Sequence, residues 1–309
     1  MAEKYRLVTR SDFDGLVCAV LLKELGMLDE ILFVHPKDMQ DGKIAVTGRD
    51  ITTNVPYVPG VHLAFDHHLS ETVRLKERAA NHIIAPRAMS AARVVYDYFG
   101  GAAKFRRIKD EVMTAVDKAD AARFSKEEIL EPDGWALLNY LMDPRTGLGR
   151  FREFRISNYQ LMMTLIDECL TKTVDEILEL PDVKERVALY REHEPKAKEQ
   201  IVRCSKVHLN LVVLDLRDQD TIWPTNRFTI YALFPQCNIS IHVMWGLKKQ
   251  NTVLAIGKSI LDRSSKTYVG GLALKYGGGG HEAAGTCQVD NDKADSVLKK
   301  LITQITRDG

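Results

Sequence analysis

Short apolar runs and helical patterns alternate over the first third of the chain. A β-type run at residues 5–8 is followed by a turn and then by apolar residues from Leu16 to Leu25 at helical spacing. Further short apolar runs at 31–34, 44–46 and 61–65 are each bounded by Pro, Gly or Asp, which is typical of strands. This alternation predicts a largely parallel sheet covered on both faces, with ligands at the carboxyl ends of its strands.

The pattern changes twice further along the chain. Residues 90–182 are helical in pattern, and residues 184–206 carry many charges and few large aliphatic side chains, which indicates an exposed helical segment. Beyond it, runs at 207–214, 228–234, 239–245 and 252–256 predict strands, and residues 268–275 and 293–305 predict helices. We therefore expect an α/β domain at 1–183, a helical linker at 184–206 and a smaller α+β domain at 207–309.

Composition and charge narrow the classes of function. The length of 309 residues, 45% of them hydrophobic, exceeds one usual core and agrees with two domains. Lys plus Arg (43) nearly cancel Asp plus Glu (42), so we expect no long duplex nucleic acid as partner. The five cysteines are scattered, which argues against a disulfide framework or a zinc knot. Without a signal-peptide pattern or a spanning apolar run, we expect a cytoplasmic protein with no membrane role.

Side chains that ligate hard metals gather in short segments of the first domain. Most of them follow a predicted strand, so they can share one edge of the sheet. One lies in the helical Ala-Val-Asp-Lys-Ala-Asp-Ala-Ala segment, with Asp117 three residues before it on the same helical side. The candidates are Asp12, Asp14, Asp50, Asp66, His67, His68 and Asp120.

Carboxylates and imidazoles suit manganese, magnesium, zinc or iron rather than copper or an iron-sulfur cluster. Two such ions about 3.5 to 4 Å apart stabilise charge on a phosphorus-centred transition state, so the predicted reaction is phosphoester or phosphoanhydride hydrolysis. Each part also has an ordinary explanation. Asp-x-Asp-Gly is a common turn, adjacent histidines are often structural, and single aspartates cap turns or solvate helices. The joint placement favours a shared site.

Several motifs resemble those of the DHH phosphoesterase superfamily. They are Ser-Asp-Phe-Asp-Gly at 11–15, Phe-Asp-His-His at 65–68 and Ala-Asp-Ala-Ala at 119–122, in this order. Arg263-Ser264 followed by the glycine run and His-Glu-Ala-Ala-Gly at 276–285 is similar to the signature of the DHH-associated C-terminal domain. Within the superfamily the chain looks most like exopolyphosphatase-related proteins, with kin among nano-RNases and phosphoadenosine phosphatases. The resemblance implies a catalytic domain at 1–183, a substrate-binding domain at 207–309 and an active site in the cleft between them.

The resemblance also implies a role for each residue of the first domain. Asp12 would ligate one divalent ion and Asp14 the other, and Asp50 would bridge them. His67 and Asp120 would complete the second ion's ligands. Asp66 and His68 would be catalytic, Asp66 by orienting a histidine and His68 by facing the substrate phosphate. The implied cofactor is manganese, two ions per site, with magnesium or cobalt as alternatives.

One position departs from the family pattern. Members with this short first motif usually carry His or Asp two residues before the first aspartate, where this chain has Arg10. A guanidinium stays protonated and offers only donors, so it cannot ligate a metal. Arg10 would weaken binding of the first ion, leave the ligand set of that ion to be completed by water or substrate, or bind phosphate itself. We favour weakened binding.

The second domain supplies the candidate substrate-binding residues. Consecutive glycines before His281 allow the backbone to approach an anion closely, as in a phosphate-binding loop, although a bare glycine run is more often a hinge. Arg263, at a strand-to-helix turn, would add a bidentate phosphate contact. The expected set is Arg263, Ser264, Gly278, Gly279, Gly280 and His281. Trp223 and Phe228 are candidates for stacking a base but are more often packing residues.

We expect an enzyme that hydrolyses a small nucleotide-type phosphodiester or phosphomonoester, such as a short oligoribonucleotide or phosphoadenosine phosphate, with a metal-activated water. One alternative is an exopolyphosphatase or pyrophosphatase, against which the balanced net charge counts. An alternative of another class is a non-catalytic nucleotide or cyclic-dinucleotide sensor, which Arg10 favours. The sequence leaves a homodimer open.

Overall fold

The computed structural model describes residues 3–75, 77, 79–151 and 153–309. The chain forms two compact units. The first comprises Met1–Arg123, Pro132–Pro144 and Leu148–Ala188, and the second comprises Phe124–Glu131, Arg145–Gly147 and Leu189–Gly309. The last passage from the first unit to the second lies inside a single long helix, α10 (Pro181–Cys204), which contains most of the predicted linker.

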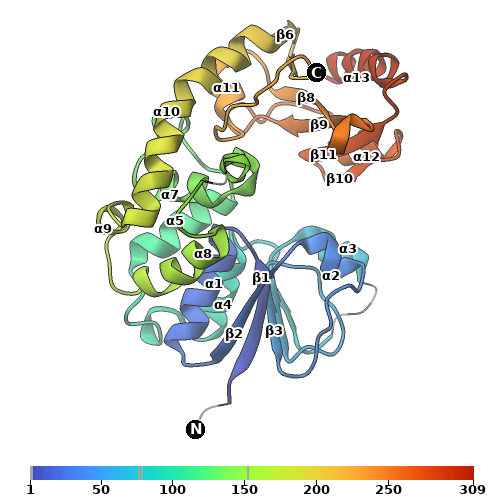
Figure 1. Ribbon diagram of the computed structural model, residues 1–309. Coiled ribbons are helices and arrows are strands. Elements are labelled where there is room, and N and C mark those ends of the chain that lie inside the picture. The colour runs from blue at the N-terminus through green and yellow to red at the C-terminus, as the bar shows by residue number, and fades with distance from the viewer. Residues whose placement is uncertain (1–2, 76, 78, 152) are drawn as a thin grey trace. The chain divides into compact units, whose positions relative to one another are not determined.

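The first unit contains a parallel five-stranded sheet (Figure 1). Its strands have the order β2-β1-β3-β4-β5 and pair in parallel throughout. They are β1 (Tyr5–Arg10), β2 (Leu28–Val34), β3 (Asp50–Thr53), β4 (Leu63–Asp66) and β5 (His82–Ile84). The parallel sheet expected from the alternating pattern is therefore present.

The predicted strand at 44–46 is wrong. Ile44 and Val46 lie outside the sheet and pack against a small apolar cluster of Val8, Met39 and Val55. The third strand is instead Asp50–Thr53, whose side chains are buried although most are polar. Two of them are bonded across the sheet to β1: the Asp50 carboxylate binds Arg6, and Thr53 Oγ1 lies 2.7 Å from Thr9 Oγ1. Hydrophobicity alone misses this strand because its buried residues are mostly polar.

Helix α1 (Phe13–Glu24) fixes the position of the first acidic motif. It packs on β1 and on the helices α4 (Ala91–Tyr98), α5 (Asp110–Asp120) and α8 (Asn158–Glu168). Because neighbours surround it, most of its side chains are fully buried, and its apolar residues lie on all faces. The unit's other helices are α2 (Pro36–Gln40), α3 (Leu69–Arg74), α7 (Gly134–Met142) and α9 (Val174–Leu178).

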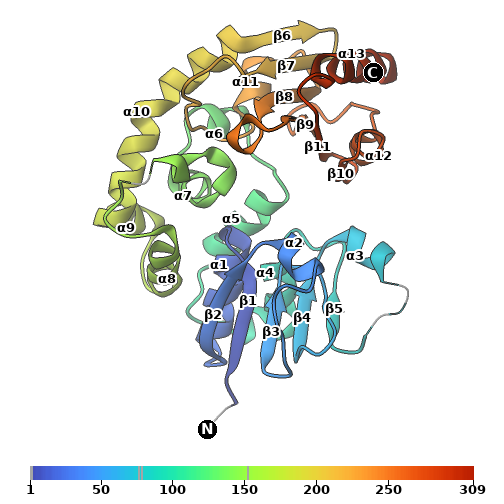
Figure 2. The ribbon, with the colours of Figure 1, turned by 45° about the vertical axis from the view of Figure 1, so that its right-hand side comes forward.

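The second unit contains a six-stranded mixed sheet of order β10-β11-β9-β8-β7-β6, in which only the β7–β8 pair is parallel (Figure 2). The strands are β6 (Ser205–His208), β7 (Leu211–Asp215), β8 (Ile239–Trp245), β9 (Thr252–Lys258), β10 (Gly279–Gly280) and β11 (Ala284–Val289). One face packs in a single core with α12 (Val269–Leu274) and α13 (Ala294–Asp308). The unit also contains α6 (Lys126–Leu130) and α11 (Thr229–Leu233).

The predicted strand at 228–234 is wrong, because this segment is the short helix α11. Its apolar residues Ile230 and Tyr231 are buried, and the Tyr231 hydroxyl bonds to Ser240 Oγ (2.8 Å) and to the carbonyl of Gly257 (2.7 Å). A short apolar run has no period that separates a buried strand from a buried helix.

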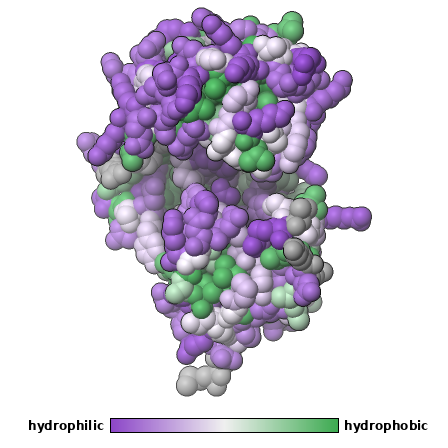
Figure 3. Space-filling view, turned by 90° about the vertical axis from the view of Figure 1, so that its right-hand side faces the viewer, coloured by the Kyte–Doolittle hydropathy of each residue, from purple (hydrophilic) through white to green (hydrophobic). Residues whose placement is uncertain are grey.

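Hydrophilic residues predominate in each unit on the face that Figure 3 draws, and hydrophobic residues form smaller patches among them. Among the described residues, no helix has both the length and the apolar character to cross a bilayer.

Candidate metal centre

The first acidic motif begins at the carboxyl end of β1 and continues into α1. Asp12 caps the helix, and its Oδ1 accepts a hydrogen bond from the Gly15 backbone N–H at 3.0 Å. Gly15 is required here, since a Cβ would lie 2.0 Å from the carbonyl oxygen of Arg10. The register pairs Thr9 with Thr53 and Thr53 with Phe65, so the loops after β1, β3 and β4 leave the sheet at one edge.

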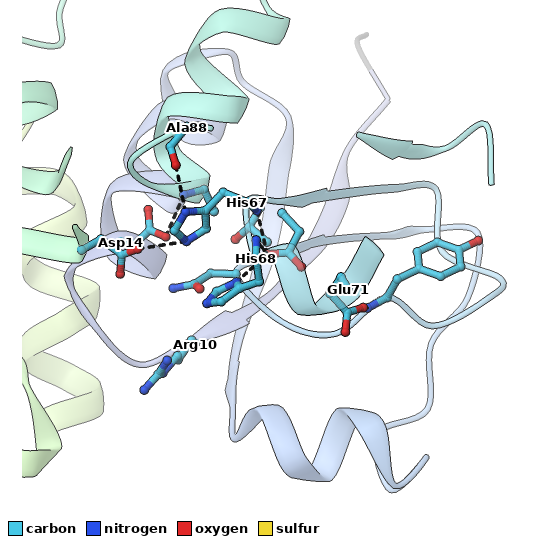
Figure 4. Close-up of polar contacts among 12 residues, drawn as sticks. Arg10, Asp14, His67, His68, Glu71 and Ala88 are labelled. Carbon is cyan, nitrogen blue, oxygen red and sulfur yellow. Dashed lines mark hydrogen bonds and ion pairs between the residues drawn. The ribbon is translucent and has the colours of Figure 1, made fainter. Parts of the chain in front are cut away.

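Asp14, His67 and Asp120 form a cluster at this edge, with one ligand atom of each within 4.8 Å of the others. His67 Nδ1 lies 3.2 Å from the carbonyl oxygen of Ala88 and therefore carries the proton, which leaves the Nε2 lone pair toward the acids (Figure 4). Asp120 Oδ2 lies 2.9 Å from Nε2. A lone pair and a carboxylate oxygen this close need a proton or a cation between them, so the donor set fits a divalent ion.

Asp14 is held in place by a neighbouring helix. Its two carboxylate oxygens accept the backbone N–H groups of Ala91 (2.9 Å) and Ala92 (2.8 Å), which are free donors of the first turn of α4. Burial and, secondarily, the charge of Asp120 raise the pKa of Asp14 to about 8, against the opposing effect of His67. A buried carboxylate beside a second carboxylate is thus costly without a nearby cation, which again fits a metal ion.

The negative charges of the cluster also act on His67. Burial alone would lower the pKa of His67, but the hydrogen bond and charge of Asp120, with the charge of Asp14, raise it to about 9. Without an ion, a proton between His67 and Asp120 therefore stabilises the cluster. A bound ion would replace this proton.

Asp66 ends β4 and organises the histidines that follow it. Its Oδ1 accepts hydrogen bonds from the backbone N–H of His67 (2.7 Å) and His68 (3.1 Å) and from His68 Nδ1 (2.7 Å). Asp66 is buried, whereas the His68 side chain is 44% exposed. Burial opposes the charged form of His68, but Asp66 outweighs it and raises the pKa of His68. His68 is therefore an oriented, partly exposed donor for an anion.

Asp12 has surroundings of a different kind. Its Oδ2 lies 3.0 Å from Arg10 Nε, and its Oδ1 accepts a hydrogen bond from Asn54 Nδ2 at 3.1 Å. Asn54 directly follows β3, is buried, and has a left-handed backbone with φ of 56°. Asn tolerates this conformation better than most residues. Sequence reasoning missed Asn54, and the one signal of this turn was an Asn two residues before Pro56.

The expectation that Asp50 joins the ligands is wrong. Asp50 begins β3 rather than following a strand, and it pairs in register with Arg6 near the start of β1. Its carboxylate binds Arg6 Nε at 2.7 Å and the Thr47 backbone N–H at 2.6 Å. These partners lower the pKa of Asp50 although burial opposes them. Asp50 is thus an ion-paired structural residue at the opposite end of the strand.

Asp117 also has a structural position. It accepts a hydrogen bond from Ser90 Oγ (2.7 Å), the N-cap of α4, and binds Arg93 Nη2 (2.7 Å). It therefore fixes α4 against α5 and, through α4, the two backbone N–H groups that hold Asp14.

The glycine run of the second unit forms one side of a tight hairpin. Gly279 and Gly280 pair with Thr286 and Gly285 of β11, so part of the run belongs to the sheet rather than to an open loop or a hinge. A Cβ at Gly278 would lie 2.1 Å from the Thr286 carbonyl oxygen. His281 is exposed at the turn, with its backbone N–H bonded to the carbonyl of Ala284 at 2.8 Å.

Arg263 and Ser264 lie between β9 and α12, as expected. Arg263 is exposed, with Nε 3.3 Å from the Ile260 carbonyl oxygen, and Ser264 Oγ accepts a hydrogen bond from Asn238 Nδ2 at 3.0 Å. Phe228 is buried and its ring lies 6.1 Å from that of Phe124, so it packs in the unit and is not offered to a base.

Comparison with solved structures finds a relative over the full chain. The chain is similar to the pGpG-specific phosphodiesterase PggH from Vibrio cholerae, with 63% identity, a TM-score of 0.88, and coverage of 99% of this chain and 100% of that one. RecJ from Thermus thermophilus, solved with Mn²⁺, shares the fold at 11% identity and a TM-score of 0.51, over 99% of this chain and 52% of RecJ. CDC45 from Entamoeba histolytica shares it at 10% identity and a TM-score of 0.50, over 98% and 95%. No family model and no curated protein matches the chain.

Proposed function

The chain belongs to the DHH phosphoesterase superfamily, and we propose that its substrate is a short linear guanine dinucleotide of the pGpG type. The likeness to PggH has 63% identity overall and covers 99% of this chain, so the matched region extends over both units. The chain is an enzyme that hydrolyses a nucleotide-type phosphodiester, as the motifs predicted. Cleavage of the internal ester of pGpG by water gives two molecules of GMP.

The cluster of Asp14, His67 and Asp120 is the observation that supports hydrolysis most directly. We propose that these residues hold manganese, with magnesium or cobalt as substitutes, since carboxylate and imidazole ligands suit these ions. A divalent ion bound there supplies positive charge for the phosphorus-centred transition state and activates water.

The remaining residues bind and orient the substrate in this proposal. Asp66 fixes the ring of His68, which donates a hydrogen bond to a phosphate oxygen. In the second unit, the exposed guanidinium of Arg263 binds a terminal phosphate with two parallel hydrogen bonds. Ser264 and the exposed His281 add donors for phosphate or sugar oxygens.

The two alternatives from the sequence have less support. An exopolyphosphatase reads a long chain of charges and would gain from a basic surface, but Lys plus Arg and Asp plus Glu number 43 and 42. A sensor without turnover has no need of a cluster of mutually repelling ligands, whereas Asp14, His67 and Asp120 are all present.

The test is hydrolysis by the full chain with Mn²⁺, scored by chromatography of the nucleotides released. The substrates are pGpG, pApA, phosphoadenosine phosphate, pyrophosphate and polyphosphate, and pGpG should be consumed fastest with two GMP per substrate. His67→Ala should abolish turnover. His62→Ala is the matched control, because His62 is an exposed histidine whose ring stacks on Tyr5. Faster cleavage of polyphosphate, or binding of pGpG without GMP release, would refute the proposal.

A further inference from the structure

The two aspartates of the first motif face opposite kinds of neighbour. Asp14 lies with Asp120 and with the lone pair of His67, which are acceptors that need a cation. Asp12 lies among donors: the Gly15 N–H at 3.0 Å, Asn54 Nδ2 at 3.1 Å and Arg10 Nε at 3.0 Å. Both oxygens of Asp12 are thus satisfied by the protein itself, and no ion is required there.

Asn54 occupies the place from which a bridging carboxylate would act. It follows the carboxyl end of β3, between the loops after β1 and β4, whereas Asp50 lies at the other end of that strand. A carboxylate at position 54 would face Asp12 at about 3 Å and would need a cation between them. The amide instead donates its own N–H to Asp12.

The amide group also limits what Asn54 can ligate. Its nitrogen is directed to Asp12, which leaves one acceptor, Oδ1, and among the described residues this buried oxygen has no hydrogen-bond partner. The Asn54 side chain donates its N–H to Asp12 and has one oxygen left. It can therefore ligate one ion but cannot bridge two. The orphaned oxygen is therefore available as a neutral ligand or as an acceptor for a bound water.

Asp66 and His68 pair with each other at this edge of the sheet, and the remaining charges balance with one ion. Asp12, Asp14 and Asp120 together carry three negative charges when ionised, and Arg10 supplies one positive charge beside Asp12. One divalent ion completes the balance. A second divalent ion beside Asp12 would be repelled by the guanidinium and would find no second carboxylate at position 54.

We propose that this centre holds one divalent ion, on Asp14, His67 and Asp120, and that the Arg10 guanidinium with the Asn54 amide takes the place of a second ion. The inference deepens the proposed phosphodiesterase function and rests on it for the identity of the reaction. The fixed cation of Arg10, whose side chain is 31% exposed, then faces the substrate phosphate where the resemblance implied a second metal.

Ion stoichiometry tests the inference without any assay of activity. Ion-free full chain is titrated with Mn²⁺ by calorimetry, and the loaded protein is measured by electron paramagnetic resonance. The expected result is one ion per chain and the six-line spectrum of an isolated Mn²⁺. Arg10→His with Asn54→Asp restores an imidazole and a carboxylate around Asp12, so the double variant should bind two ions and give a spin-coupled spectrum.

Two further variants keep the test decisive if the double variant fails to fold. Asp12→Asn retains a helix cap and should still bind one ion, because Asp12 is no ligand of the retained ion. Arg49→His, an exchange of an exposed arginine in the same unit, should also leave one ion. Two coupled ions in the wild-type chain, loss of the ion in Asp12→Asn, or one ion in a folded double variant would overturn the inference.

The outcomes separate the inference from the proposed function. A chain that binds one ion but releases no GMP from pGpG keeps the one-ion centre and refutes the substrate. A chain that binds two coupled ions and cleaves pGpG keeps the substrate and refutes the one-ion centre.

Discussion

Replacing Asp120 with Asn removes one of the three ligands that we propose and leaves its helix intact. Asp120 is the last residue of α5, its side chain is 25% exposed, and its Oδ2 lies 2.9 Å from His67 Nε2. A divalent ion about 3 Å from the charge centre of a ligating carboxylate gains roughly 11 kcal/mol at an effective dielectric constant of about 20. Carboxylate desolvation, and the ion pair with His67 that the ion-free protein gives up, offset more than half of this gain. We expect a net loss of about 3 kcal/mol, which weakens Mn²⁺ binding about 100-fold.

Calorimetric titration of Mn²⁺ measures this loss, and Asp117→Asn is its matched control. Asp117 lies three residues earlier on the same helix, but its carboxylate holds Ser90 and Arg93. Its replacement should lower the melting temperature and, because Asp117 reaches Asp14 only through α4, weaken ion binding far less than Asp120→Asn does. Asp120→Asn should mainly weaken ion binding. Unchanged Mn²⁺ affinity in folded Asp120→Asn would show that the ion, if bound, lies elsewhere.

Three other changes test the second unit. Gly280→Ala places a Cβ 2.3 Å from the carbonyl oxygen of Ala284 at a φ of 157°. Thermal unfolding should therefore show that the free energy of unfolding falls by roughly 1–3 kcal/mol. A Cβ at Gly279 meets no atom within 4 Å, so Gly279→Ala should melt like the wild type. Burial lowers the pKa of His242 from 6.5 to about 4, so the unfolded chain binds a proton there that the folded chain does not. The free energy of unfolding should therefore fall as the pH drops from about 6.5 toward 4, and urea titrations of His242→Asn should show a flatter dependence. Arg263→Ala should raise KM for pGpG about tenfold with a smaller effect on kcat, and an unchanged KM would remove Arg263 from the substrate site.

The sequence predicts those parts of the fold in which apolar residues follow a period. The first strand, the helix after it and the strand before Asp66 are where the pattern places them. The third strand was misplaced because Asp50–Thr53 is buried as a polar segment, with Thr53 bonded to Thr9 across the sheet. Such burial depends on partners far away in the sequence, and no local pattern records it.

The same distinction applies to the site. Motif order selected Asp14, His67 and Asp120 as candidates, and the structure places one ligand atom of each within 4.8 Å of the others. Asp50 was a plausible ligand by residue type, but register decides which end of a strand a side chain occupies, and register sends it to Arg6. Asn54 was not selected from the sequence, because Asn residues are common in turns.

Asp12 and Asp14 are two positions apart in the sequence, and helix geometry gives them different chemical surroundings. Asp12 is the N-cap, so its carboxylate folds back onto the first turn of its own helix and accepts the Gly15 N–H. Asp14 lies inside the first turn, about 200° further round the axis, and its carboxylate meets the start of α4 instead. Asp14 accepts one backbone N–H on each carboxylate oxygen and keeps further lone pairs that can face the cluster with His67. The oxygens of Asp12 instead accept hydrogen bonds from the Gly15 N–H, the Asn54 amide and the Arg10 guanidinium. A motif with two aspartates therefore does not by itself imply two ions, because the number of ions depends on which donors the rest of the fold brings to each carboxylate.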